Sequence, residues 1–312
     1  MPAFPPPPPA RIVSINLCAD QYLLALANRS RIAAVTVYAA DPGMSAAAGA
    51  AHGIAVTRAA AEELLVLAPD LILAAPYQVA AKAALLPGTR IVAVPEANDE
   101  PAIEANIATV AAAVGYPERG RRLIAAMRAE LATVPADQPD GESSPNVPQS
   151  RRPVAAQYQR GGYLSGTGTL VDDLMRRAGL VNLAAVLHRP PLSRLSLEEI
   201  IAARPDYLVV ERRAVDARDR SRASDTDSAS AAIHASGMSH PGDRGAALLD
   251  HPALARAFPA AKRLTIDAAW TVCGGPAYPR AVAALKEQLA RLTPSAARLP
   301  PPARRSSSPA RR

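Results

Sequence analysis

The 312-residue chain contains few aromatic residues, only two cysteines and no long apolar run. Aromatic residues make up 4% of the chain although hydrophobic residues make up 49%, so alanine, leucine and valine must supply most of the core. A membrane-spanning helix needs about 18 or more consecutive apolar residues, and no such stretch occurs. The length allows two hydrophobic cores, so these properties are typical of a globular protein with more than one domain.

The excess of basic residues lies mainly at one end of the chain. The net charge is +7, but residues 293–312 contain five arginines and no acid, so the rest is close to neutral. A nucleic-acid-binding surface needs basic side chains clustered on the folded part, with aromatic residues between them. The sequence lacks such a cluster, so we expect no nucleic-acid partner.

Four segments have compositions typical of unstructured chain. They are the proline-rich start (1–10), a linker (135–152), a polar insertion (212–245) and a basic tail (293–312). Residues 1–10 have neither the basic nor the apolar region of a signal peptide, so we expect no export signal in this chain. The insertion directly follows a predicted strand. It is either a lid over a binding site or a solvent-exposed segment without a functional role.

Two stretches 136 residues apart are nearly the same: EELLVLAPDLIL (62–73) and EEIIAARPDYLV (198–209). Each predicts a helix whose first turn is acidic, as the helix dipole favours, and whose end is marked by proline. The apolar run after each Pro-Asp predicts a strand buried on both faces, as in a parallel sheet. Both halves also open with a strand–turn–helix pattern, at 11–27 and 152–179, so the sequence predicts a duplicated α/β architecture.

The fold class we expect is α/β, with two Rossmann-like lobes, parallel-rich sheets and a ligand cleft between the lobes. The lobes comprise residues 11–116 and 153–292. Between them, residues 117–134 have apolar side chains on one helical face and basic side chains opposite. This pattern predicts one long helix that joins the lobes rigidly.

No motif for catalysis, a metal or a cofactor stands out. The turn at 166–174 contains G-x-G, but Val171 takes the place of the third glycine of a dinucleotide fingerprint. The five histidines form no zinc motif, and no G-x-S-x-G elbow is present. The sequence therefore indicates no catalytic residue, no metal and no cofactor.

The two cysteines, Cys18 and Cys273, both follow predicted strands. They are too far apart in sequence for a C-x-x-C motif. They are either small buried residues or residues that face the space between the lobes, where they could pair or contact a ligand.

Five further residues come at the ends of predicted strands: Tyr38, Tyr77, Tyr163, Glu211 and Trp270. The carboxyl ends of parallel strands meet at one edge of a sheet, where open α/β sheets bind ligands. A single Tyr or Trp at a strand end is more often a half-buried packing residue. Together they predict an aromatic-lined cleft between the lobes.

The order of seven segments resembles the substrate-binding proteins of ABC importers for cobalamin and ferric siderophores. The segments are RIVSINLCADQYLLALA (11–27), RIAAVTVYAADP (31–42), EELLVLAPDLILA (62–74), GGYLSGTGTLVDDLMRRAGLVN (161–182), LSRLSLEEIIAARPDYLVV (192–210), HPAL (251–254) and AWTVCGGP (269–276). The resemblance implies a periplasmic or surface-tethered receptor, without enzymatic activity and expected to be a monomer. It would carry an iron–siderophore or corrinoid ligand, held by the strand-end residues, to a permease in the inner membrane.

The resemblance also implies that a carboxylate near the top of each lobe contacts arginines of the permease. In the second lobe Glu198 matches this position, although a role in favouring its helix terminus explains it as well. In the first lobe the matching segment is 78–86, which offers Lys82 and no acid, and Glu62 or Glu63 cannot simply be substituted for it. The cobalamin receptors that the chain resembles often present several tryptophans to the corrin ring, so the single tryptophan, Trp270, favours a smaller or more polar iron complex.

Two other functions stay open at this stage. An α/β enzyme could use the same cleft for a nucleotide or a phosphate-bearing substrate, with the G-x-G turn as its only support. A degenerate paralogue could keep the fold without transport, as the missing signal and first-lobe acid would suggest.

Overall fold

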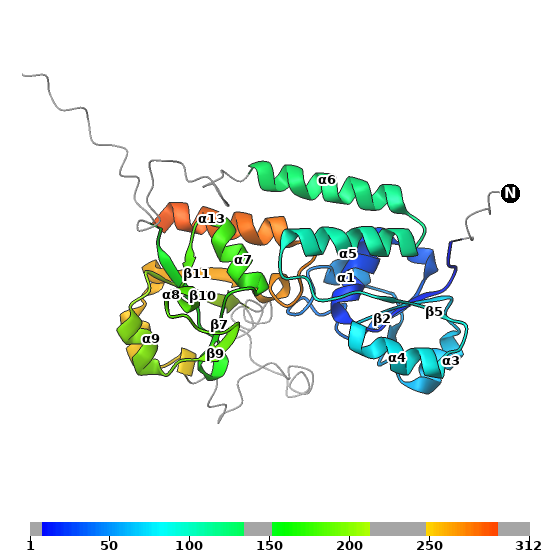
Figure 1. Ribbon diagram of the computed structural model, residues 1–312, viewed down its shortest axis with the longest axis horizontal. Helices are drawn as coiled ribbons and strands as arrows, with labels where there is room; N and C mark the ends of the chain where they lie inside the picture. The colour runs from blue at the N-terminus through cyan, green and yellow to red at the C-terminus, as the bar shows by residue number, and fades with distance from the viewer. Residues whose placement is uncertain (1–7, 134–151, 213–247, 293–312) are drawn as a thin grey trace, which may run out of the picture.

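The computed structural model describes residues 8–133, 152–212 and 248–292 and has two α/β lobes side by side (Figure 1). The segments expected to be unstructured fall almost wholly outside these ranges. The fold class expected from the sequence is confirmed.

The N-terminal lobe contains one five-stranded sheet in which every strand pair is parallel. The strand order is β3-β2-β1-β4-β5, so it reverses between β1 and β4. The strands are β1 (Ile12–Ser14), β2 (Ile32–Thr36), β3 (Val56–Thr57), β4 (Leu71–Ala74) and β5 (Arg90–Ala93). The helices are α1 (Leu17–Leu26), α2 (Ala48–Ala51), α3 (Ala61–Leu67), α4 (Pro76–Leu85) and α5 (Glu100–Ala113).

The C-terminal lobe contains a four-stranded parallel sheet in the order β11-β10-β6-β8 and a small antiparallel pair, β7 and β9. The strands are β6 (Val154–Gln157), β7 (Tyr163–Ser165), β8 (Val181–Asn182), β9 (Leu192–Arg194), β10 (Tyr207–Arg212) and β11 (Arg263–Asp267). The helices are α7 (Leu170–Arg177), α8 (Leu183–Val186), α9 (Leu197–Ala203), α12 (Pro252–Ala257) and α13 (Tyr278–Leu292), and the short 3₁₀ helix η5 (Ala268–Trp270) follows β11.

Helix α6 (Pro117–Thr133) corresponds to the helix expected between the lobes. It packs against α5 of the N-terminal lobe and α13 of the C-terminal lobe, along one side of the molecule (Figure 1). The largest apolar cluster also continues from one lobe to the other, with Leu23 and Ile107 from the first and Leu174 and Leu285 from the second. Because protein interiors are close-packed, this shared core makes the connection stiff.

The repeated Pro-Asp dipeptide has the same role in both lobes. The Asp70 carboxylate accepts a hydrogen bond from the backbone N–H of Arg11, just before β1, at 2.9 Å. The Asp206 carboxylate accepts one from the backbone N–H of Val154, at the start of β6, at 2.8 Å. Each aspartate thus satisfies a backbone donor at the beginning of the neighbouring strand, which explains why both halves carry the dipeptide.

Among the helices of the described ranges, none has both the length and the apolar character needed to cross a membrane.

Candidate functional site

The strand order of the C-terminal lobe reverses between β6 and β10. In open α/β sheets, ligands bind outside the carboxyl ends of the strands at such a reversal. Gln157 is the last residue of β6, and its Nε2 donates a hydrogen bond of 2.7 Å to Oε1 of Glu211 near the end of β10. This pair marks the position where the fold favours a binding site.

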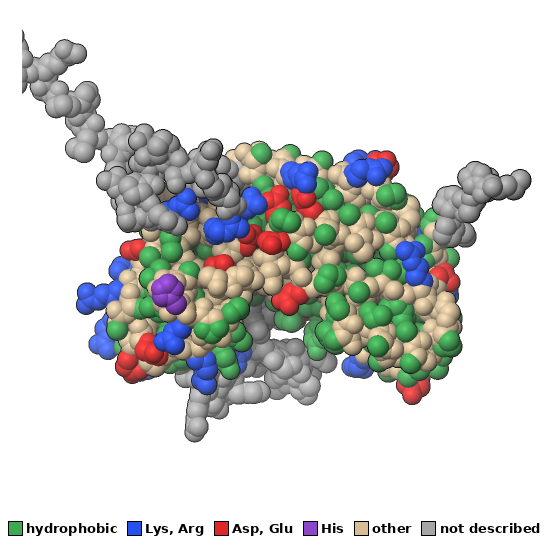
Figure 2. All heavy atoms as spheres, viewed as in Figure 1, with side chains coloured by type: hydrophobic (Ala, Val, Ile, Leu, Met, Phe, Trp, Pro, Cys, Tyr) green, Lys and Arg blue, Asp and Glu red, His purple; other side chains and the backbone are tan. Residues whose placement is uncertain are grey.

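A cleft of about 300 Å³ lies at this position. That volume is at the lower end of the range for small-molecule sites. From the C-terminal lobe, the cleft is lined by the strand ends, the start of α7 and the loop after η5. From the N-terminal lobe, it is lined by Glu96 and Asn98, which follow β5. Figure 2 shows the surface hollowed between the lobes on the side away from α6.

Hydrogen bonds preorganise the polar lining. Gln159 Nε2 donates to Ser165 Oγ at 2.7 Å, and Ser165 Oγ donates to Gln157 Oε1. Thr271 Oγ1 donates to Glu211 Oε1 at 2.7 Å. The side chains of Gln157 and Thr271 thus both donate to the Glu211 carboxylate and fix its orientation. Both of these bonds end on Oε1, so among the residues that the structure describes Oε2 is the oxygen left to accept a donor from a ligand.

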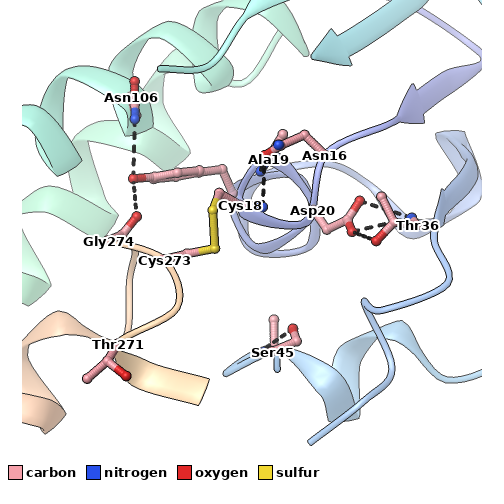
Figure 3. Close-up of a disulfide and its surroundings, with 12 residues drawn as sticks. Asn16, Cys18, Ala19, Asp20, Thr36, Ser45, Asn106, Thr271, Cys273 and Gly274 are labelled. Atoms are coloured by element: carbon pink, nitrogen blue, oxygen red, sulfur yellow. Dashed lines mark hydrogen bonds between the residues drawn. A yellow bond between two sulfur atoms is a disulfide. The ribbon is translucent and has the colours of Figure 1, made fainter. Parts of the chain in front are cut away.

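Cys18 and Cys273 form a disulfide between the lobes. Figure 3 shows the bond between the first turn of α1 and the loop after η5, which also carries Thr271 of the cleft lining. Of the two alternatives left open by the sequence, pairing is the one observed. Both thiols are consumed in the bond, so neither cysteine offers a thiolate to a ligand.

A buried tyrosine holds the same loop from the N-terminal lobe. The Tyr22 hydroxyl donates a 2.7 Å hydrogen bond to the carbonyl of Gly274. The same hydroxyl lies 3.5 Å from Nδ2 of Asn106. Figure 3 labels Asn106 and Gly274, the partners in these two contacts. Burial raises the pKa of Tyr22 to about 12, so the hydroxyl stays protonated and acts as the donor.

The backbones of the two lobes come very close beside this hydrogen bond. A Cβ atom on Gly274 would lie 1.9 Å from the carbonyl oxygen of Ala97. Ala97 stands between Glu96 and Asn98, so the contact fixes the N-terminal rim of the cleft against the loop of the C-terminal lobe. Only glycine permits this approach.

Asp20 is a buried acid on α1, on the side away from the disulfide (Figure 3). Its carboxylate accepts hydrogen bonds from the backbone N–H and the hydroxyl of Thr36, at the end of β2. Burial raises the pKa of Asp20 to about 6, against the lowering effect of hydrogen bonds from Ser14 and Thr36. It joins α1 to β2 and is not part of the cleft lining.

Of the five strand-end residues expected at the site, Glu211 lines the cleft. Trp270 directly precedes Thr271 of the lining and packs half-buried against the main core. Tyr38, Tyr77 and Tyr163 are 54%, 80% and 40% exposed, and none of the three lines this cleft. A contact between these tyrosines and a ligand stays a prediction.

The position of Tyr163 differs from the expected one because the chain after β6 forms an additional strand. Tyr163 begins β7 and pairs with Arg194 of β9. The Arg194 guanidinium lies 5.3 Å from the centre of the Tyr163 ring, a cation–π contact. The ring therefore already has a partner on the small antiparallel sheet.

Sequence reasoning missed most of the polar lining. Gln157 and Ser165 are the last residues of β6 and β7, and Gln159 follows β6 by two residues, so the rule of strand ends could have found them. Glu96 and Asn98 lie in coil, where no local pattern marks them.

The Gly-rich turn before α7 has a packing role. A Cβ atom on Gly166 would lie 2.2 Å from the carbonyl oxygen of Pro190. Glycine is required there because the two backbones are in contact, so the turn needs no phosphate ligand to explain it. Within the part of the chain that the structure describes, no group of three His, Cys, Asp or Glu residues could hold a metal ion.

Segment 78–86, which the resemblance matched to the region of Glu198, is not the structural counterpart of that region, and permease docking itself stays a prediction. Helix α3 of the first lobe is the counterpart of α9, because both end at a left-handed residue, Ala68 and Arg204, directly before the repeated Pro-Asp. Six residues before that point stand Glu62 and Glu198, and both are exposed. Lys82 belongs to the next helix, α4, where its Nζ donates to the carbonyl of Ala59. The first lobe therefore does have an equivalent acid.

Two parallel-sheet lobes, a bridging helix and a cleft between strand ends define a two-lobed binding protein. The sequence of residues 12–236 matches the family described as periplasmic binding protein, and the chain belongs to this family. Membership implies a location outside the cytoplasm, which agrees with a disulfide. A search of curated proteins found no match.

Solved structures share the fold along nearly the whole chain. A periplasmic heme-binding protein from Roseiflexus sp. RS-1 is 23% identical, with a TM-score of 0.62, over 90% of this chain and 98% of its own. A periplasmic vitamin B12-binding protein from Vibrio cholerae is 18% identical, with a TM-score of 0.56, over 91% and 98%. A protein of an Fe3+-hydroxamate transport system from Saccharomonospora viridis is 17% identical, with a TM-score of 0.54, over 90% and 93%.

Proposed function

We propose that the protein is the periplasmic solute-binding receptor of an ABC importer. It captures a ferric siderophore, or a related iron complex, in the cleft between the lobes and delivers it to a permease in the inner membrane. The observation that carries this proposal is the polar, preorganised cleft at the strand-order reversal of a two-lobed periplasmic binding protein.

The chemistry of the lining favours a chelate that brings all of its own iron ligands. Heme iron needs an axial ligand such as histidine, tyrosine, cysteine or methionine. None of these lines the described part of the cleft, where amides, hydroxyls and the carboxylates of Glu96 and Glu211 predominate. A corrin ring would be expected to stack on aromatic side chains, which the described lining also lacks. Heme and cobalamin, bound by the relatives, are the second candidates.

The alternative of a nucleotide-binding enzyme loses its only support. The G-x-G turn is explained by the contact between Gly166 and Pro190. A missing first-lobe acid no longer argues for the degenerate paralogue, because Glu62 on α3 is the structural counterpart of Glu198 on α9.

Delivery requires a surface that the permease recognises. Glu62 belongs to α3 and Glu198 to α9. These two helices lie near opposite ends of the long axis of the molecule, on the side away from α6 (Figure 1). This spacing suits two separate contacts with a two-subunit permease, as the resemblance to importers for cobalamin and siderophores implies.

A titration of the purified protein tests the ligand class. Ferric hydroxamate, catecholate and citrate complexes, heme and cobalamin would be added while Trp270 fluorescence is followed, since it is the single tryptophan and precedes Thr271 of the lining. We expect saturable quenching at micromolar or lower concentration for one ferric chelate. The same titrations would be repeated by calorimetry. If folded protein gave no response to any compound by either method, the proposal would be refuted. A nucleotide panel serves as the control for the enzyme alternative.

A further inference from the structure

The charges that face the cleft are of one sign. Glu96 contributes a carboxylate from the N-terminal lobe and Glu211 one from the C-terminal lobe. Among the residues that the structure describes, the lining contains no lysine, arginine or histidine. A cleft with low-dielectric walls concentrates the field of such charges and attracts ligands of opposite sign.

The amino terminus of helix α7 acts in the opposite direction, because it favours a negatively charged ligand. The amino terminus of α7 contributes Thr169, Leu170 and Val171 to the lining, and a helix amino terminus carries roughly half a positive charge. The two carboxylates of Glu96 and Glu211 outweigh this partial positive charge. The first turn of α7 also contains Asp172 and Asp173, which reduce its attraction for an anion.

The bonding of Glu211 makes its charge available to a ligand. The hydrogen bonds from Gln157 and Thr271 hold the Glu211 carboxylate in place. Because both end on Oε1, Oε2 can accept a hydrogen bond from a cationic donor without breaking the existing network. A ligand carboxylate or catecholate oxygen at this place would meet a like charge.

We propose that the cleft selects a ferric chelate that carries a cationic ammonium group, and that Glu211 and Glu96 are the residues that determine this specificity. The inference rests on the proposed function and names the ligand class within it. In a ferric trihydroxamate, the three hydroxamates neutralise the iron, so a free amine at the end of the molecule makes the complex a monocation. A ferric tricatecholate is instead a trianion, which the two carboxylates would repel.

The experiment compares ligands that differ in charge. Ferrioxamine B, its N-acetylated neutral form and ferric enterobactin would each be titrated into the full chain by isothermal calorimetry at low and high salt. We expect ferrioxamine B to bind about tenfold or more tightly than the acetylated form, with the difference reduced by salt. We expect the trianion to bind most weakly.

Variants connect the effect to the two carboxylates. Glu211→Gln and Glu96→Gln should each reduce the preference for the ammonium form, whereas Glu130→Gln, which removes an exposed carboxylate from α6, should leave it unchanged. Equal binding of the charged and acetylated forms, or tighter binding of ferric enterobactin, heme or cobalamin, would overturn the inference and leave the receptor function intact. Failure of all these ligands to bind folded protein would overturn both.

Discussion

Cys18 and Cys273 are 255 residues apart in sequence, yet their Cα atoms lie 5.3 Å apart and their sulfurs are bonded. The bond connects the first turn of α1 to the loop that carries Thr271 and Val272 of the cleft lining. Tyr22 and the contact of Gly274 with Ala97 support the same junction. The two rims of the cleft are therefore fixed to each other, so large opening of the lobes is restricted.

Loss of the disulfide should destabilise the protein. A bond that closes so long a loop restricts the unfolded chain, and removal of such a bond typically costs roughly 2–5 kcal/mol. We expect a reductant to lower the denaturant midpoint of the wild type. The double variant Cys18→Ala/Cys273→Ala should show the low midpoint with and without reductant. Identical midpoints for oxidised wild type and the double variant would contradict the stabilising role.

Gly274→Ala should disturb the junction without removing any polar group. Its new methyl group would collide with the Ala97 carbonyl, and overpacking of this kind costs about 1–3 kcal/mol. Gly275→Ala is the matched control, because its Cβ would be 3.7 Å from the nearest atom, Oε1 of Gln21. We expect a lower thermal midpoint and weaker ligand binding for the first variant only. Equal behaviour of the two variants would show that the loop can move without cost.

The elements of the fold could be predicted because they depend on local patterns. The buried strands and the proline-terminated helices are each encoded in a few adjacent residues, as the repeats around Asp70 and Asp206 show. Their periodicity determines which face is buried. The structure has strands at 71–74 and 207–212, where the sequence predicts them.

The site could be predicted only in outline. A strand end indicates the edge of the sheet on which a residue lies, but not whether its side chain faces the cleft, so Glu211 was found while Tyr77 is mostly exposed. Glu96 comes from coil that tertiary contacts place against Gly274. The pairing of Cys18 with Cys273 likewise depends on how the lobes pack, which no local pattern records.

The stability of the protein should depend on the ionisation of Asp20. Its folded pKa of about 6 is above the ordinary value of 3.8, so between these values the unfolded state releases its proton first. Asp20 therefore lowers the free energy of unfolding progressively as pH rises from about 4 to about 6, by at most about 3 kcal/mol.

Asp20→Asn should remove this contribution. Relative to wild type, the variant should gain stability as pH rises from 4 to 7, measured as the difference in denaturant midpoints. Asp250→Asn, a substitution of an exposed aspartate, should show no such trend. A constant difference between Asp20→Asn and wild type at all pH values would contradict the raised pKa.

Glu62 and Glu198 should act in delivery and not in ligand binding. Both are exposed, and neither belongs to the cleft lining. If they contact arginines of the permease, their removal should slow association, because electrostatic attraction raises the rate of encounter. In a strain whose only copy of the receptor is the variant, Glu62→Gln/Glu198→Gln should reduce uptake of the ferric complex by about tenfold.

The purified variant should keep the ligand affinity of the wild type, which separates delivery from capture. Glu63 and Glu199 are the matched comparison, since they stand one residue further along the same helices. Their carboxylates are instead hydrogen-bonded to Thr57 and Arg58 and to Ser196. Glu63→Gln/Glu199→Gln should therefore affect stability more than uptake. Normal uptake by the Glu62/Glu198 variant would show that the permease recognises another surface.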